Sequence, residues 1–164
     1  MTVLNDIAKA MNSYPLDETT LDIVEVANTS DSKDTHVSSG ETWKFKVKLT
    51  NNGHVNMTHV SLKVTGMHGT KVSASATAGF SDSIVAADLN PLGGGDSRIT
   101  NFMFFKPPIV GTTSSTDLLE VQINDWSGDD FNHMFSNHTL SVDKAADEGI
   151  VYAKERLTRE LNPG

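Results

Sequence analysis

Apolar and polar residues alternate most clearly in the segment Trp43–Leu49, where four apolar residues are separated by three lysines. Successive side chains of a β-strand point to opposite faces, so this pattern predicts a strand with one face in a core and the other in water. The sequence Asn51-Asn52-Gly53 follows and is typical of a turn, because Asn and Gly tolerate positive φ. Residues 55–66 alternate in the same way, and we predict that they form the partner strand.

Other short strands are predicted where apolar residues alternate with polar ones between clusters of Gly, Pro, Asn, Asp and Ser. This spacing of short strands and turns favours an antiparallel β-sandwich of immunoglobulin-like type, with about seven strands, over alternating strand–helix units. The further predicted strands cover residues 21–27, 70–77, 84–85, 98–108, 118–126 and 134–142.

The first residues of the chain have a helical period instead. Leu4, Ile7 and Met11 are spaced for one face of a short helix, and Pro15 ends the pattern. We therefore predict an N-terminal helical arm over residues 1–15.

The last residues also have a helical period. Ile150, Leu157 and Leu161 lie at helical spacing among charged residues, which predicts an amphipathic helix over 143–164. Such an apolar stripe has to be buried, either on the sandwich of its own chain or on a neighbouring subunit. The predicted organisation is a helical arm at 1–15, a sandwich at 20–142 and a helix at 143–164.

Charge and composition exclude several classes of function. The formal net charge of −8 repels phosphate backbones, so we expect neither nucleic acid nor an anionic membrane as a partner. The absence of cysteine removes disulfides, thiolate metal sites and cysteine nucleophiles. No apolar run is long enough to span a membrane, and the N-terminus lacks a secretory signal pattern. The expected compartment is the cytoplasm by default, or the surface or exterior if the chain is trimmed or exported by another route.

Three stretches resemble a known family. SSGETWKFKVKLTNNGHVNMTHVSLKV, LNPLGGGDSRITNFMFFKP and DDFNHMFSNHTLSV are similar to the two alternating strands, the later glycine turn and the last hairpin of CARDB-like, cell-adhesion-related modules. The resemblance covers residues 38–142 and implies an immunoglobulin-like sandwich that serves as a spacer, an adhesin, or a carbohydrate- or protein-binding appendage. Neither terminal helix belongs to that family pattern, which favours a stand-alone protein or an assembly subunit.

The loop after residue 125 is the candidate ligand site. Trp126 stands beside Asp129, Asp130 and Asn132, and an exposed aromatic ring next to acidic and amide groups is a common platform for sugars. The structural alternative is that Trp126 closes the end of the core.

The same loop is the candidate metal site. Asp125, Asp129, Asp130 and His133 offer hard oxygens and an imidazole, which suit Ca²⁺ or Zn²⁺. The spacing is not that of an EF-hand, and Asp and Asn are also ordinary turn residues. Our main expectation is therefore that the protein needs no cofactor.

No arrangement of residues points to catalysis, so we expect a protein that is not an enzyme. There is no GxSxG motif, no serine has a recognisable His and Asp context, and the glycines at 93–95 lack the Lys-Ser/Thr of a phosphate loop. We predict a non-catalytic module that binds a protein or a glycan through loops at one end of the sandwich. The alternatives are a structural subunit that self-associates through the terminal helices, with Ile150, Leu157 and Leu161 in the contact, and a metal-dependent binding protein.

Overall fold

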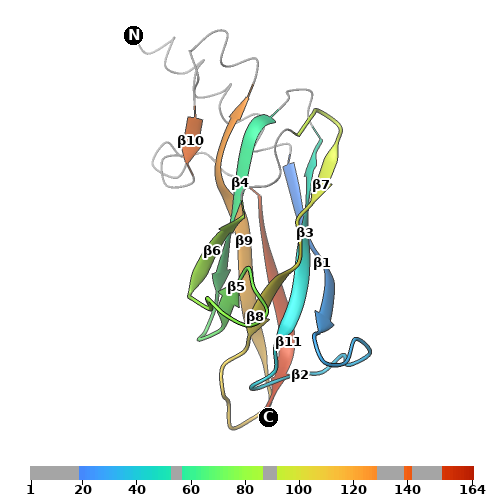
Figure 1. Ribbon diagram of the computed structural model, residues 1–164, viewed down its shortest axis with the longest axis vertical. Helices are drawn as coiled ribbons and strands as arrows, with labels where there is room; N and C mark the ends of the chain where they lie inside the picture. The colour runs from blue at the N-terminus through green and yellow to red at the C-terminus, as the bar shows by residue number, and fades with distance from the viewer. Residues whose placement is uncertain (1–18, 53–56, 87–91, 129–138, 142–152) are drawn as a thin grey trace.

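The computed structural model describes residues 19–52, 57–86, 92–128, 139–141 and 153–164, which form two facing β-sheets (Figure 1). In sheet A the order is β1-β3-β8-β5, with β7 also paired to β3. In sheet B it is β2-β11-β9-β4-β6, with β10 also paired to β9. The strands of sheet A are β1 (Thr19–Asn28), β3 (Trp43–Asn51), β5 (Lys71–Ser73), β7 (Ser97–Ile99) and β8 (Met103–Lys106). Those of sheet B are β2 (Val37–Ser38), β4 (Met57–Gly66), β6 (Ser83–Ala86), β9 (Ser114–Gly128), β10 (Thr139–Ser141) and β11 (Lys154–Asn162).

The core lies between the sheets, and it confirms the predicted sandwich. Buried and half-buried residues alternate along the whole of β3, as the sequence pattern requires. Trp43 and Phe45 pack on Phe105 of β8, with ring centroids 6.4 and 5.9 Å apart. In the described ranges there is no helix long and apolar enough to cross a membrane.

The predicted pairing of residues 55–66 with 43–49 is wrong. β3 pairs with β1, β7 and β8 in sheet A, whereas β4 pairs with β6 and β9 in sheet B. Both strands have one buried face. Two such strands bury that face equally well side by side in one sheet or opposite each other in two facing sheets. Alternation therefore identifies the strands but does not select their partners.

The predicted C-terminal helix is also wrong where the structure describes the chain. Residues 154–162 form β11, which lies in sheet B between β2 and β9. Leu157 and Leu161 are four residues apart, and this even spacing places both on one face of a strand as well as on one face of a helix. They are 3% and 0% exposed and belong to the core. Residues 1–15 and 143–152, the remainder of the predicted helices, lie outside the described ranges.

A β-bulge interrupts the edge of sheet A between β7 and β8. Lys48 of β3 faces Ile99, and Lys44 faces Phe104, so the β7–β8 side contains one residue more than β3 over the same length. Thr100 holds the bulge. Its N–H donates to the Val47 carbonyl (2.9 Å), and its hydroxyl accepts from the Val47 N–H (2.9 Å).

We predict that Thr100→Val destabilises the protein by about 1–3 kcal/mol, because the N–H of fully buried Val47 loses its hydroxyl acceptor. Urea unfolding measures the change in the free energy of unfolding. Thr65→Val makes the same exchange at a half-buried position of β4 and should change stability by less than about 0.5 kcal/mol. Equal effects of the two substitutions would contradict this role for the Thr100 hydroxyl.

Candidate functional site

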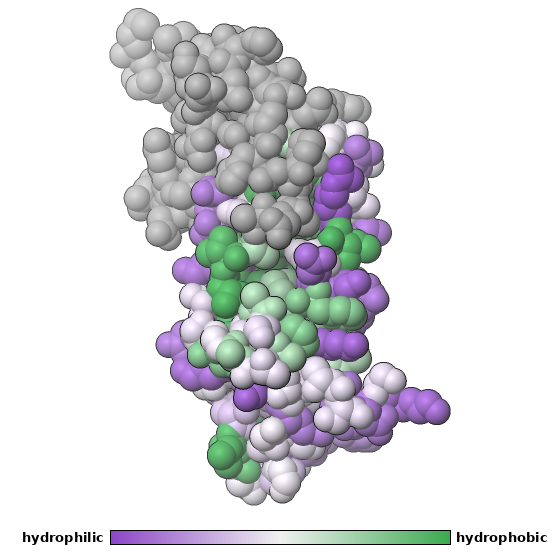
Figure 2. Space-filling model, in the orientation of Figure 1, coloured by the Kyte–Doolittle hydropathy of each residue, from purple (hydrophilic) through white to green (hydrophobic). Residues whose placement is uncertain are grey.

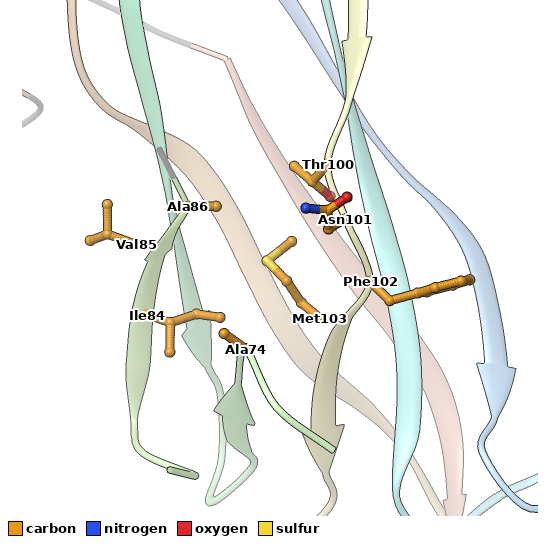
Figure 3. A pocket seen from close by; sticks show the side chains of 8 residues that line it. All are labelled: Ala74, Ile84, Val85, Ala86, Thr100, Asn101, Phe102 and Met103. Carbon is orange, nitrogen blue, oxygen red and sulfur yellow. The ribbon is translucent and has the colours of Figure 1, made fainter. Parts of the chain in front are cut away.

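A groove runs along one side of the sandwich, and we call it the lateral groove. It lies between β6 of sheet B and the β7–β8 edge of sheet A, and its volume is about 350 Å³ (Figure 3). Its walls are mainly apolar. The lining residues are Ala74, Ile84, Val85, Ala86, Thr100, Asn101, Phe102 and Met103.

Strand geometry determines which side chains point into the lateral groove. Ile84 and Ala86 of β6 point into the groove, while Val85 between them points away (Figure 3). From the other wall, Met103 points toward β6, and the neighbouring Phe102 ring is turned toward β3 (Figure 3). Adjacent residues of a strand point to opposite faces, and the bulge determines that Met103 rather than Phe102 faces the groove, because the extra residue shifts the alternation of the edge strand by one position.

Both sheet edges that flank the groove lack a neighbouring strand in the described part of the chain. β6 pairs only with β4, and β7 pairs only with β3, since β5 covers the edge of β8 alone. Natural proteins often protect such edges with charged residues, with proline or by keeping the strand very short. β6 has four residues, Ser, Ile, Val and Ala, and β7 contains Arg98. Val85 and Ile99 are 56% and 52% exposed, and Figure 2 shows apolar surface across the middle of this face.

A second hollow, the end pocket, is lined by residues of β9 and β11 and has a volume of about 440 Å³. Asp117 in its wall accepts hydrogen bonds from Thr158 (2.5 Å) and Arg156 (3.4 Å), and His68 Nδ1 lies 3.0 Å from its carbonyl oxygen. The Thr158 hydrogen bond, together with the Arg156 charge, holds the pKa of the Asp117 carboxyl below its usual range. The Thr158 and Arg156 contacts link β9 to β11, and the His68 contact links the turn after β4 to β9, so these polar groups serve the fold. The lining residues are His68, Pro108, Val110, Ser115, Thr116, Asp117, Thr158 and Leu161.

Thr158→Val should make stability less dependent on pH in the acid range. Because the pKa of Asp117 is depressed in the fold, its ionised form stabilises the protein above the ordinary aspartate pKa, and that stability disappears as pH falls through the depressed value. At about pH 6 the variant should have a lower thermal unfolding temperature than the wild type. Between about pH 6 and pH 2.5 its unfolding temperature should fall by less than that of the wild type. Thr42→Val, a half-buried threonine elsewhere, is the control and should keep the wild-type pH slope. A wild-type slope in Thr158→Val would contradict the assignment.

Three residues of the predicted sites, Trp126, Leu157 and Leu161, are buried in the structure. Trp126 is 1% exposed and lies in the core, so its ring offers no face to a sugar. Leu157 and Leu161 pack within their own sandwich and are not available for contact with another subunit.

The predicted loop ligands stay predictions. Asp125 is half-buried and accepts a hydrogen bond from the Ser61 hydroxyl (2.6 Å). The described ranges contain no group of three or more His, Cys, Asp or Glu side chains placed to hold a metal. The other predicted residues, Asp129, Asp130, Asn132, His133 and Ile150, lie outside those ranges.

Sequence reasoning missed the lateral groove, although two signals for it exist. Residues 84–85 were predicted as a short strand, and no charged residue lies within β6. In the segment 98–108, Phe104 and Phe105 are adjacent, which breaks strict alternation and signals an irregular edge strand. Neither signal shows that the two edges face each other, because that depends on strand order.

Comparison with known proteins gives a likeness of fold. No protein-family model matches the sequence, and no curated protein matches it. AvmM, which catalyzes macrocyclization in alchivemycin A biosynthesis, is 13% identical with a TM-score of 0.46, and the match covers 90% of each chain. Spo0M, a sporulation control protein from Bacillus subtilis, is 9% identical with a TM-score of 0.44, and the match covers 90% of this chain and 50% of that one.

A CARDB domain from Pyrococcus furiosus is also among the matches. It is 11% identical with a TM-score of 0.38, and the match covers 87% of this chain and 86% of that domain. At these values, the comparisons carry no information about activity, ligand or partner. The CARDB-like resemblance of the sequence therefore extends to a β-sandwich and no further.

Proposed function

We propose that this protein is a non-catalytic binding module that holds an extended segment of a partner protein in the lateral groove, paired as an added strand with β6. The observation that carries this proposal is the pair of open sheet edges, of which the β6 edge has no charged residue, facing each other across an apolar groove. An open edge presents backbone N–H and C=O groups, and an extended peptide satisfies them by strand addition.

The groove walls suit a peptide of alternating character. Side chains on one face of an added strand recur every second residue, at the period with which Ile84 and Ala86 enter the groove. Met103 forms the opposite wall and is 4% exposed. Backbone pairing would supply affinity, and the apolar walls would select small or medium apolar side chains at alternate positions.

Self-association is the second candidate function, and the exposure of Val85 favours it. The same uncharged edge of β6 can pair with β6 of a second copy, and Val85 on its outer face is 56% exposed. This assembly would use a sheet edge rather than the terminal helices predicted from the sequence.

Ala86→Arg should block the lateral groove. The probe is a fluorescein-labelled peptide of eight residues in which valine alternates with serine, and fluorescence anisotropy measures its affinity. We expect saturable binding to the wild-type protein and binding at least about tenfold weaker to Ala86→Arg, because the long cationic side chain fills the groove and leaves a charge against apolar walls.

Ile109→Arg is the matched control, because this side chain is 91% exposed and lies outside the lateral groove. It should bind the peptide as the wild type does, and circular dichroism should show that all three proteins are folded. Absence of saturable binding to the wild type, or equal binding by Ala86→Arg, would contradict the proposal. A dimer seen by light scattering that dissociates in Ala86→Arg, without peptide binding, would replace it with self-association.

A further inference from the structure

We propose that the partner segment is acidic where it passes Phe102, and that Lys44 and Lys46 recognise this charge. The inference rests on the proposed function, because it concerns the same groove. It names the chemistry of the occupant: an extended peptide with alternating apolar residues and a carboxylate at one end of the bound stretch.

Phe102 connects the lateral groove to these lysines. The residue lines the groove, and its ring extends toward β3 (Figure 3). The ammonium groups of Lys44 and Lys46 each lie 4.4 Å from the centroid of this ring. The negative face of an aromatic ring attracts a cation without neutralising its charge, so two positive charges are held beside the groove.

The neighbouring charges leave this position positive. Lys48 follows on the same face of β3, two residues beyond Lys46, and its cross-strand neighbour on β1 is Asp22. Among the ion pairs between described residues, one involves these three lysines, and it joins Lys46 to Glu25 at 3.6 Å. Three lysines beside two carboxylates, Glu25 and Asp22, leave this strip, Lys44, Lys46 and Lys48, with a net positive charge on a chain whose formal net charge is −8.

The overall negative charge does not cancel the local attraction. Exposed charges more than about 10 Å apart are largely screened at 0.1 M salt, whereas groups in contact interact directly. The net charge slows the approach of an acidic partner, and the strip favours its carboxylate once the peptide lies in the groove. The preference for acidic residues should therefore weaken as salt is added.

An acidic peptide fits this surface better than a nucleic acid does. Proteins that bind single strands stack bases on exposed aromatic faces, whereas the Phe102 ring is already in contact with two ammonium groups. The apolar walls beside Phe102 have no counterpart in a phosphate backbone. Open sheet edges, by contrast, pair with a polypeptide backbone.

The test compares the valine–serine peptide with two variants that carry glutamate at either the first two or the last two polar positions. One of the two glutamate peptides should bind the wild type about three to ten times more tightly than the serine peptide at low salt. This ratio should fall toward one in the double variant Lys44→Gln/Lys46→Gln, which removes both charges and keeps much of the aliphatic stem on Phe102.

Lys154→Gln/Arg159→Gln is the matched control, since it removes two positive charges from β11 in the other sheet. This variant should keep the wild-type ratio. A wild-type ratio near one, or an unchanged ratio in Lys44→Gln/Lys46→Gln, would overturn the inference even though serine-peptide binding still supports the proposed function. Loss of serine-peptide binding by the wild type would instead overturn the proposed function itself. Tight binding of single-stranded oligothymidylate that requires Lys44 and Lys46 would assign the strip to nucleic acid and also overturn the inference.

Discussion

Two hydrogen bonds between Thr100 and Val47 hold an extra residue in the edge strand of sheet A, and the lateral groove depends on that residue. Without the extra residue, side chains would alternate regularly along 97–106. With it, Met103 faces the core and the groove, while the adjacent Phe102 contacts the lysines of β3. One backbone irregularity thus places an apolar wall next to a positively charged surface.

The open side of the sandwich follows from the short strands around this bulge. β5 is three residues long and covers β8 but not β7, and β6 ends sheet B with four residues. A longer strand at either edge would close the groove. The β6 edge is short and carries no charged residue, so an added strand can pair with it without burying a charge.

The alternation of apolar and polar residues was enough to predict most strands. It failed where the pairing of strands that are distant in the sequence determines the structure. The alternation of Trp43–Leu49 fixed β3, because each apolar residue had a polar neighbour on both sides. The even spacing of Leu157 and Leu161 suits a helix and a strand equally, and only pairing with β9 and β2 distinguishes them. The lateral groove could not be predicted from the sequence for the same reason. The order of the strands in the two sheets, and not their proximity in the sequence, places β6 opposite β7.

Amide hydrogen exchange of β6, with and without the valine–serine peptide, tests the central claim most directly. The open edge of β1 at the other end of sheet A is the internal reference. Strand addition predicts that the amides of Ile84, Val85 and Ala86 that exchange fast in the free protein become protected when the peptide binds, while those of β1 keep their rates. Unchanged exchange in β6 under saturating peptide, or protection that appears in β1 instead, would contradict the lateral groove as the binding site.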